Sequence, residues 1–70
     1  MHENKTMIQG ELRLPSNRKV NLVAFNTRTI YELKPHNPNG IRAGLGQLEI
    51  HRIEIEKIFE PEWNTILVTY

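Results

Sequence analysis

The chain has 70 residues, with nine basic against eight acidic side chains, a formal net charge of +1 and no cysteine. This length allows one small domain over residues 1–70, so we expect part of its stability to come from a partner or a second copy. Disulfide frameworks and thiolate metal sites are excluded, and the near-neutral charge does not by itself indicate nucleic acid.

The chain opens on a polar stretch, residues 1–6, which is expected to be a flexible N-terminal segment. No apolar run approaches the roughly 18 residues that a transmembrane helix needs. We therefore expect a cytoplasmic protein with no signal peptide and no membrane partner. All the acidic residues are glutamates, so any mechanism that requires an aspartate is closed to this chain.

Three strands are predicted before residue 36. Residues 7–14 alternate between apolar and polar side chains, which is the period of a half-buried strand, and Pro15-Ser16-Asn17 then forms a turn. A second strand is expected over residues 20–25. The short polar stretch Asn26-Thr27-Arg28 predicts a hairpin turn into a third strand over residues 29–34.

A single helix is predicted from about residue 38 to about residue 59. Asn37 suits the N-cap and Pro38 the first helical position. One apolar stripe at helical spacing is expected to lie against the sheet, and it consists of Ile41, Leu45, Leu48, Ile55 and Phe59. Gly44 and Gly46 weaken the first turns of this helix. Pro61 ends the helix, and residues 63–70 then predict a last strand that Trp63 anchors against the helix.

The predicted fold class is α+β, in the order β-β-β-α-β, with one long helix packed on a mixed sheet. Ile50, Ile53 and Ile58 fall off the main helical stripe. They leave a second apolar surface that a chain of this size has little material to cover. This favours a homodimer or a larger parent protein.

Glu32 and Lys34 are the strongest candidates for chemistry. Side chains two apart on a strand project from the same face, so the two groups can converge on one site. A carboxylate there can bind Mg²⁺ or Mn²⁺, and an ammonium beside it can stabilise charge on a phosphate or orient an attacking water. By itself the Glu-x-Lys spacing is a weak signal, because on an ordinary strand it is usually a solvated charge pair.

A longer ordered pattern accompanies this pair, comprising Ile30-Tyr31-Glu32-Leu33-Lys34-Pro35, Asn37-Pro38, Gly40-Ile41, Gly44 and Gln47-Leu48. It resembles the PD-(D/E)xK nuclease superfamily, and within it the restriction-endonuclease-fold domains of bacterial polymorphic toxins. The resemblance implies a minimal restriction-endonuclease-like core and metal-dependent hydrolysis of DNA or RNA, with a cognate immunity protein as a partner. It also implies catalytic roles for Glu32, Lys34 and the helical Gln47.

The chain departs from the family's pattern at several places. Upstream of the motif tyrosine the family has a metal-binding aspartate, and this sequence has Asn21. An amide oxygen lacks the charge that a divalent cation prefers, which puts hydrolysis in doubt. Glu11 is a candidate replacement. A helical tyrosine found in related nucleases is replaced by His51, a residue type more often at the surface, and residues 1–6 are too few for the family's N-terminal helix.

Local basic residues provide candidate contacts for nucleic acid, namely Arg18, Lys19, Arg42 and His36. Arg42 is predicted near the helix N-terminus, where phosphates bind well, and His36 could shuttle protons next to the motif. In the plainer interpretation these are exposed side chains that keep the chain soluble.

Three functions remain open on this evidence. The chain is a metal-dependent nuclease, a nuclease-fold protein that no longer cuts, or an interaction module in which the Glu-x-Lys pair has no role. The second includes both a natural degenerate copy and a domain disarmed by an Asp→Asn change. The sequence does not separate DNA from RNA as the substrate.

Overall fold

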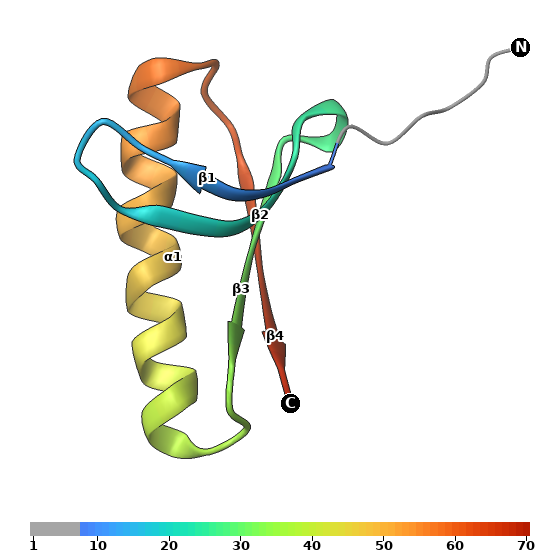
Figure 1. Cartoon of the computed structure of the whole chain (residues 1–70), viewed down its shortest axis with the longest axis vertical. Helices are drawn as coiled ribbons and strands as arrows, with labels where there is room; N and C mark the ends of the chain where they lie inside the picture. The colour runs from blue at the N-terminus through green and yellow to red at the C-terminus, as the bar shows by residue number, and fades with distance from the viewer. Residues whose placement is uncertain (1–7) are drawn as a thin grey trace, which may run out of the picture.

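The computed structural model describes residues 8–70, and the N-terminal segment expected over residues 1–6 lies outside them. The elements are β1 (Ile8–Arg13), β2 (Lys19–Ala24), a short 3-10 helix η1 (Phe25–Thr27), β3 (Thr29–Lys34), α1 (Pro38–Ile58) and β4 (Asn64–Thr69) (Figure 1). The predicted order β-β-β-α-β is confirmed. Each strand boundary agrees with the prediction to within one residue.

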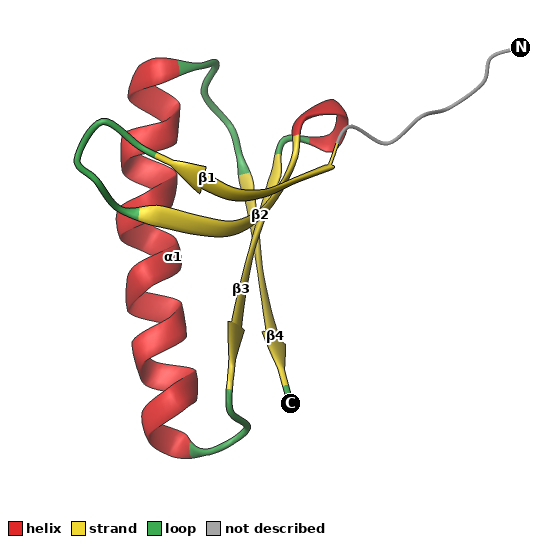
Figure 2. Ribbon diagram, in the orientation of Figure 1, coloured by secondary structure: helices red, strands yellow, loops and turns green. Residues whose placement is uncertain are grey.

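The four strands form one mixed sheet in the order β1-β2-β3-β4. β1 pairs antiparallel with β2, β2 pairs antiparallel with β3, and β3 pairs parallel with β4. Parallel neighbours need a long crossover, and α1 provides it, running beside the sheet between the end of β3 and the start of β4 (Figure 2). The mixed α+β architecture therefore follows from one long helix inserted between two adjacent strands.

The two tight connections differ in kind. The predicted turn after β1 is present, with the Asn17 amide donating to the Leu14 carbonyl at 2.8 Å and Asn17 at φ 77°, a left-handed conformation that asparagine tolerates. The hairpin predicted between the second and third strands is confirmed by the antiparallel pairing of β2 with β3, but its connection is not a simple turn over residues 26–28. Residues Phe25–Thr27 form η1 instead, and Arg28 closes it at φ 49° with its guanidinium bound to the Pro61 carbonyl.

The start of α1 follows the local capping pattern. Asn37 has extended backbone, and its side-chain oxygen accepts from the Gly40 amide at 2.7 Å. Pro38 takes the first helical position, where its missing N–H leaves no backbone donor unpaired. The helix ends at Ile58, ahead of Pro61, as predicted.

The buried stripe of α1 differs from the predicted one. Leu48 and Ile55 are buried as expected, whereas Leu45 is 55% exposed and Phe59 is 44% exposed. The helix instead buries Gly44, Leu48, His51 and Ile55. Gly44 allows the helix to approach closely, since a Cβ at this position would lie 2.4 Å from the Leu67 Cδ1 atom. This contact sets the rotation of the helix and turns Leu45 outward.

The core lies between α1 and the adjacent face of the sheet and contains Leu14, Val20, Val23, Ile30, Leu48, Ile55 and Trp63. Trp63 is buried just before β4, as predicted. Ile50, Ile53 and Ile58 are each 44% exposed, so the second apolar surface predicted for the helix is also present. No helix within residues 8–70 is long and apolar enough to span a membrane.

Candidate active site

Glu32 and Lys34 do share the face of β3 that is turned toward α1. Glu32 is only 4% exposed, and its Oε2 lies 3.6 Å from the Lys34 Nζ. The Lys34 stem passes beneath the helix, because a Cβ on Gly44 would lie 2.9 Å from the Lys34 Cγ. The period-2 geometry of the strand therefore aims both groups at the helix, and the close approach at Gly44 restricts the path of the lysine.

His51 completes this cluster, although a surface position was expected for it. Its Nδ1 lies 3.9 Å from the Glu32 Oε1, and both side chains are 5% exposed. Neither atom has a hydrogen-bond partner within the described residues. The burial of His51 could have been predicted from helical spacing. It lies three residues after Leu48 and four before Ile55, both of which were predicted to be buried.

The electrostatic setting keeps the His51 imidazole neutral. Burial lowers its pKa below the usual value of 6.5, because the charged form loses hydration. The negative charge of Glu32 opposes this shift, and the positive charge of Arg18 adds to it. A neutral imidazole has one ring nitrogen with a free lone pair, which can accept a proton or bind a metal ion.

Asn21 lies beside the motif but is already engaged. The β2–β3 ladder has Leu22 opposite Tyr31, and the same register continued by one residue sets Asn21 opposite Glu32. There the Asn21 Oδ1 accepts from the Leu33 amide at 2.9 Å. The side chain therefore takes the place of the next backbone acceptor where the two strands separate.

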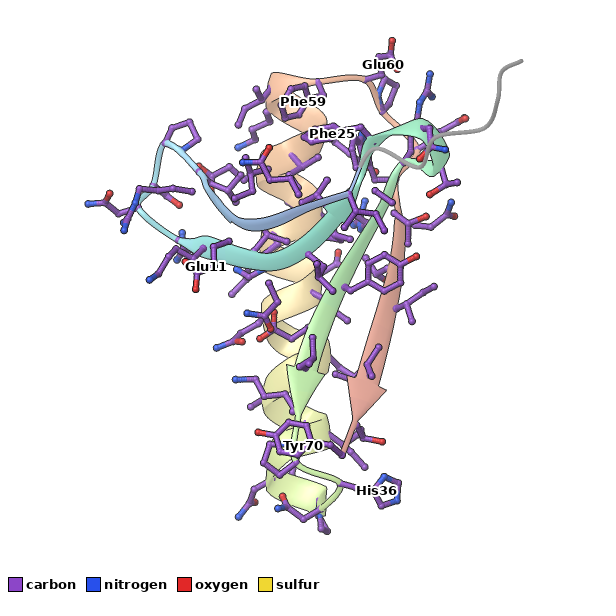
Figure 3. The ribbon with its side chains drawn as sticks, turned by 45° about the vertical axis from the view of Figure 1, so that its right-hand side comes forward. Glu11, Phe25, His36, Phe59, Glu60 and Tyr70 are labelled. Atoms are coloured by element: carbon purple, nitrogen blue, oxygen red, sulfur yellow. The ribbon has the colours of Figure 1, made fainter. Side chains whose placement is uncertain are left out.

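Glu11 does not lie alongside β3. β2 separates the two strands, so the backbone of Glu11 is roughly 10 Å from that of Glu32. Glu11 is exposed and has φ 54°, a left-handed conformation that interrupts the regular strand (Figure 3). Across residues 8–70, no group of three His, Cys, Asp or Glu residues is arranged to hold a metal ion.

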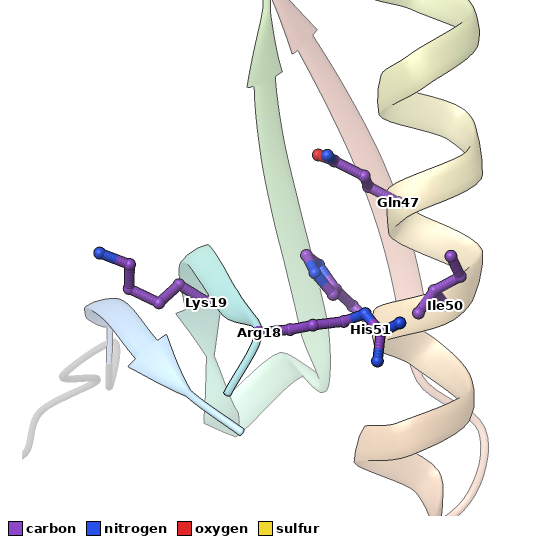
Figure 4. A pocket seen from close by; sticks show the side chains of 5 residues that line it. All are labelled: Arg18, Lys19, Gln47, Ile50 and His51. Atoms are coloured by element: carbon purple, nitrogen blue, oxygen red, sulfur yellow. The ribbon is translucent and has the colours of Figure 1, made fainter. Parts of the chain in front are cut away.

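A pocket of about 180 Å³ opens next to the cluster, lined by Arg18, Lys19, Gln47, Ile50 and His51. Gln47 and His51 extend from successive turns of α1, and Arg18 reaches toward the helix while Lys19 points away from it (Figure 4). The structure thus brings Gln47, Arg18 and Lys19 together with His51. Two positively charged side chains therefore line the pocket on the side of His51, and Glu32 itself is not part of the lining.

Two further predicted residues lie elsewhere. Arg42 is exposed and is nine residues before His51, which corresponds to about 13 Å along α1 and the opposite side of the helix. His36 is exposed beyond the end of β3, and its Nδ1 is 2.9 Å from the Thr69 Oγ1. It lies near Tyr70, at the end of the molecule away from Phe25 and Phe59 (Figure 3). Neither residue lines the pocket.

Comparison with known proteins gave one finding. A family model described as restriction endonuclease fold toxin 9 matches residues 1–70. No curated protein and no solved structure matched the chain. The match covers the Glu32 and Lys34 motif, Asn21 and the whole of α1.

Proposed function

The chain belongs to the restriction endonuclease fold toxin 9 family, and from this premise we propose that it is a metal-dependent nuclease domain that hydrolyses phosphodiester bonds in DNA or RNA. The observation that carries the proposal is the buried cluster on β3. Glu32 and Lys34 converge to 3.6 Å beneath a helix that contributes His51 and Gln47 beside a basic pocket. A charge pair without a function is usually exposed to solvent, whereas Glu32 is buried.

The donor set fits a divalent cation. The Glu32 Oε1 is buried without a hydrogen-bond partner in the described part of the chain, and an unpaired buried carboxylate oxygen is costly. Glu32 would hold Mg²⁺ or Mn²⁺, with position 21 the site of the family's second carboxylate. When bound, the cation would act as a Lewis acid that stabilises the charge developing on the phosphate.

The surrounding residues have separable roles in this proposal. The Lys34 ammonium orients the attacking water and stabilises charge on the phosphate oxygens. Gln47, exposed on the helix next to the pocket, positions the substrate through its amide. Arg18 and Lys19 attract the phosphate backbone, so binding should weaken as the salt concentration rises.

Asn21 supports a second candidate function, a nuclease-fold protein that binds nucleic acid or dimerises without cutting. Its Oδ1 accepts from the Leu33 amide, and the amide supplies no negative charge to the site. A site with one carboxylate should bind Mg²⁺ much more weakly than a site with two. On the first proposal the same feature predicts a slow enzyme.

The proposal extends to partners. A domain that cuts nucleic acid would damage the cell that makes it, so a toxin of this type requires a cognate immunity protein. The basic pocket beside Glu32 is the surface that such an inhibitor would need to cover. DNA and RNA both present the phosphates that Arg18 and Lys19 would contact.

Calorimetric titration of Mg²⁺ and Mn²⁺, followed by plasmid and RNA cleavage on the same samples, tests the proposal. The native chain is compared with Glu32→Ala, and Glu60→Ala is the matched control, because its side chain is 68% exposed and pairs with Arg28. Saturable binding and cleavage that are both lost in Glu32→Ala support the nuclease. Salt-dependent nucleic-acid binding without cleavage supports the second candidate, and a lack of both metal and nucleic-acid binding contradicts both.

A further inference from the structure

Two buried polar atoms face one another in the site, and the proposed function leaves one of them unused. The Glu32 Oε1 and the His51 Nδ1 are 3.9 Å apart, too far for a hydrogen bond, on side chains that are each 5% exposed. Both atoms lack a partner among the residues that the structure describes. Leaving two buried polar atoms unpaired is unfavourable, and a ligand bound between them would relieve this cost.

We propose that Glu32 and His51 together bind a transition-metal ion, with the imidazole nitrogen taking the place of the carboxylate that the chain lacks at Asn21. This inference rests on the proposed function and names the cation of its site. Metal–nitrogen and metal–oxygen bonds of about 2.0–2.2 Å place the two ligand atoms about 3.4 Å apart at a tetrahedral angle and at most about 4.2 Å apart. The 3.9 Å separation exceeds the tetrahedral value by about 0.5 Å, so the two side chains would move slightly closer together around a bound ion.

The ligand types select the metal. Mg²⁺ strongly prefers oxygen ligands, whereas imidazole suits Zn²⁺ and other transition metals. A metal ion binds the neutral imidazole through the lone pair of one ring nitrogen. We therefore expect Zn²⁺ and Mn²⁺ to bind more tightly than Mg²⁺.

Access and the remaining ligands also fit. Of the two side chains, His51 lines the pocket of about 180 Å³, so an ion would enter past its ring to reach the buried Glu32. Two protein ligands leave coordination positions free for water or for a phosphate oxygen of the substrate. Arg18 and Lys19 line the same pocket and would place that phosphate next to the ion.

Histidine side-chain NMR and calorimetry of the metal-free chain titrated with Zn²⁺, Mn²⁺ and Mg²⁺ test this inference. Zn²⁺ should shift the ring resonances of His51 and leave those of His36 unchanged. Affinity for Zn²⁺ should fall by more than about tenfold in His51→Gln and in Glu32→Ala. The control His36→Gln, on an exposed loop residue, should bind as the native chain does.

Unchanged Zn²⁺ affinity in His51→Gln, or unshifted His51 resonances in the native chain, would overturn the inference. If His51→Gln does not fold, the shift of the His51 ring resonances in the native chain on adding Zn²⁺ still tests the inference. Zn²⁺ binding at His51 without any cleavage would retain this site and contradict the nuclease function. Mg²⁺-dependent cleavage that survives His51→Gln would retain the nuclease and contradict the role of His51.

Discussion

The side chain at position 21 has a structural role that an aspartate could fill equally well. The Asn21 Oδ1 accepts from the Leu33 amide at 2.9 Å, and a carboxylate oxygen can accept the same hydrogen bond. Asn21→Asp should therefore fold normally and place a second carboxylate opposite Glu32. We expect metal-dependent cleavage to appear or to rise by at least tenfold, measured on plasmid and RNA substrates.

A second substitution separates the chemistry from the fold at this position. Asn21→Ala removes both the acceptor and any carboxylate, so the free energy of unfolding should fall by about 1 kcal/mol and cleavage should not rise. If folded Asn21→Asp stays as inactive as the native chain in both Mg²⁺ and Mn²⁺, the chain is not a catalyst disarmed only at this residue.

His51 predicts a pH dependence of stability. Burial lowers its pKa in the folded state below 6.5, so the unfolded chain binds protons more readily as the pH falls below this value. The contribution of neutral His51 to the free energy of unfolding should be complete above about pH 6.5. It should decline on acidification, by at most about 1.4 kcal/mol per pH unit. Carboxylates with a lowered pKa, such as Glu54, reduce the stability mainly when the pH falls below their usual pKa of 4.5. Between pH 6.5 and 4.5 the loss of stability is therefore assigned to His51.

Urea unfolding at several pH values, with a chelator present, measures this dependence. The native chain should lose stability between pH 6.5 and 4.5, and His51→Gln should have a flatter profile over the same interval. Parallel profiles for the two proteins would show that His51 does not titrate in this way.

At the scale of the elements, α1 holds the connections of the sheet in place through its carboxylates. Glu54 accepts from the Ser16 amide at 2.9 Å and from the Ser16 hydroxyl at 2.6 Å, which ties the β1–β2 turn to the helix. Glu56 accepts from the Trp63 amide at 2.9 Å and so fixes the entry to β4. Both residues lie in the last turns of α1, so this end of the helix fixes two connections of the sheet as well as covering the core.

The two glycines of α1 should respond differently to alanine. A Cβ at Gly46 meets nothing within 4 Å, so Gly46→Ala should raise the free energy of unfolding by about 1 kcal/mol through helix propensity. A Cβ at Gly44 would lie 2.4 Å from the Leu67 Cδ1 and 2.9 Å from the Lys34 Cγ. Gly44→Ala should cost about 1–3 kcal/mol, measured by urea unfolding. Equal effects of the two substitutions would contradict the close packing at Gly44.

At the scale of the whole molecule, the sheet has one protected edge and one open edge. β1 is interrupted by the left-handed Glu11 and carries charged side chains, both of which discourage pairing with another chain. β4 pairs only with β3 in the described chain, and Asn64–Thr69 contains no charge, proline or glycine. Ile66 and Val68 on this strand are 44% and 40% exposed.

We predict that β4 pairs antiparallel with β4 of a second copy. A two-fold axis makes such a contact self-complementary, and an uncharged strand brings no like charges together. Light scattering coupled to size-exclusion chromatography should give twice the chain mass for the native protein and the monomer mass for Val68→Lys. Ile53→Lys, at a similarly exposed apolar position on α1, is the matched control and should remain dimeric. Dissociation by Ile53→Lys alone would move the interface to the helix.

Features of this protein that depend on neighbouring residues were determined by the sequence alone. Alternation along residues 29–34 put Glu32 and Lys34 on one face, and Asn37-Pro38 began the helix, because both effects act over a few residues of one segment. The tertiary structure alone decided the rotation of α1, the burial of His51 and the hydrogen bond from the Leu33 amide to Asn21. Each depends on contacts between segments far apart in the sequence, such as Gly44 against Leu67, which no local pattern encodes.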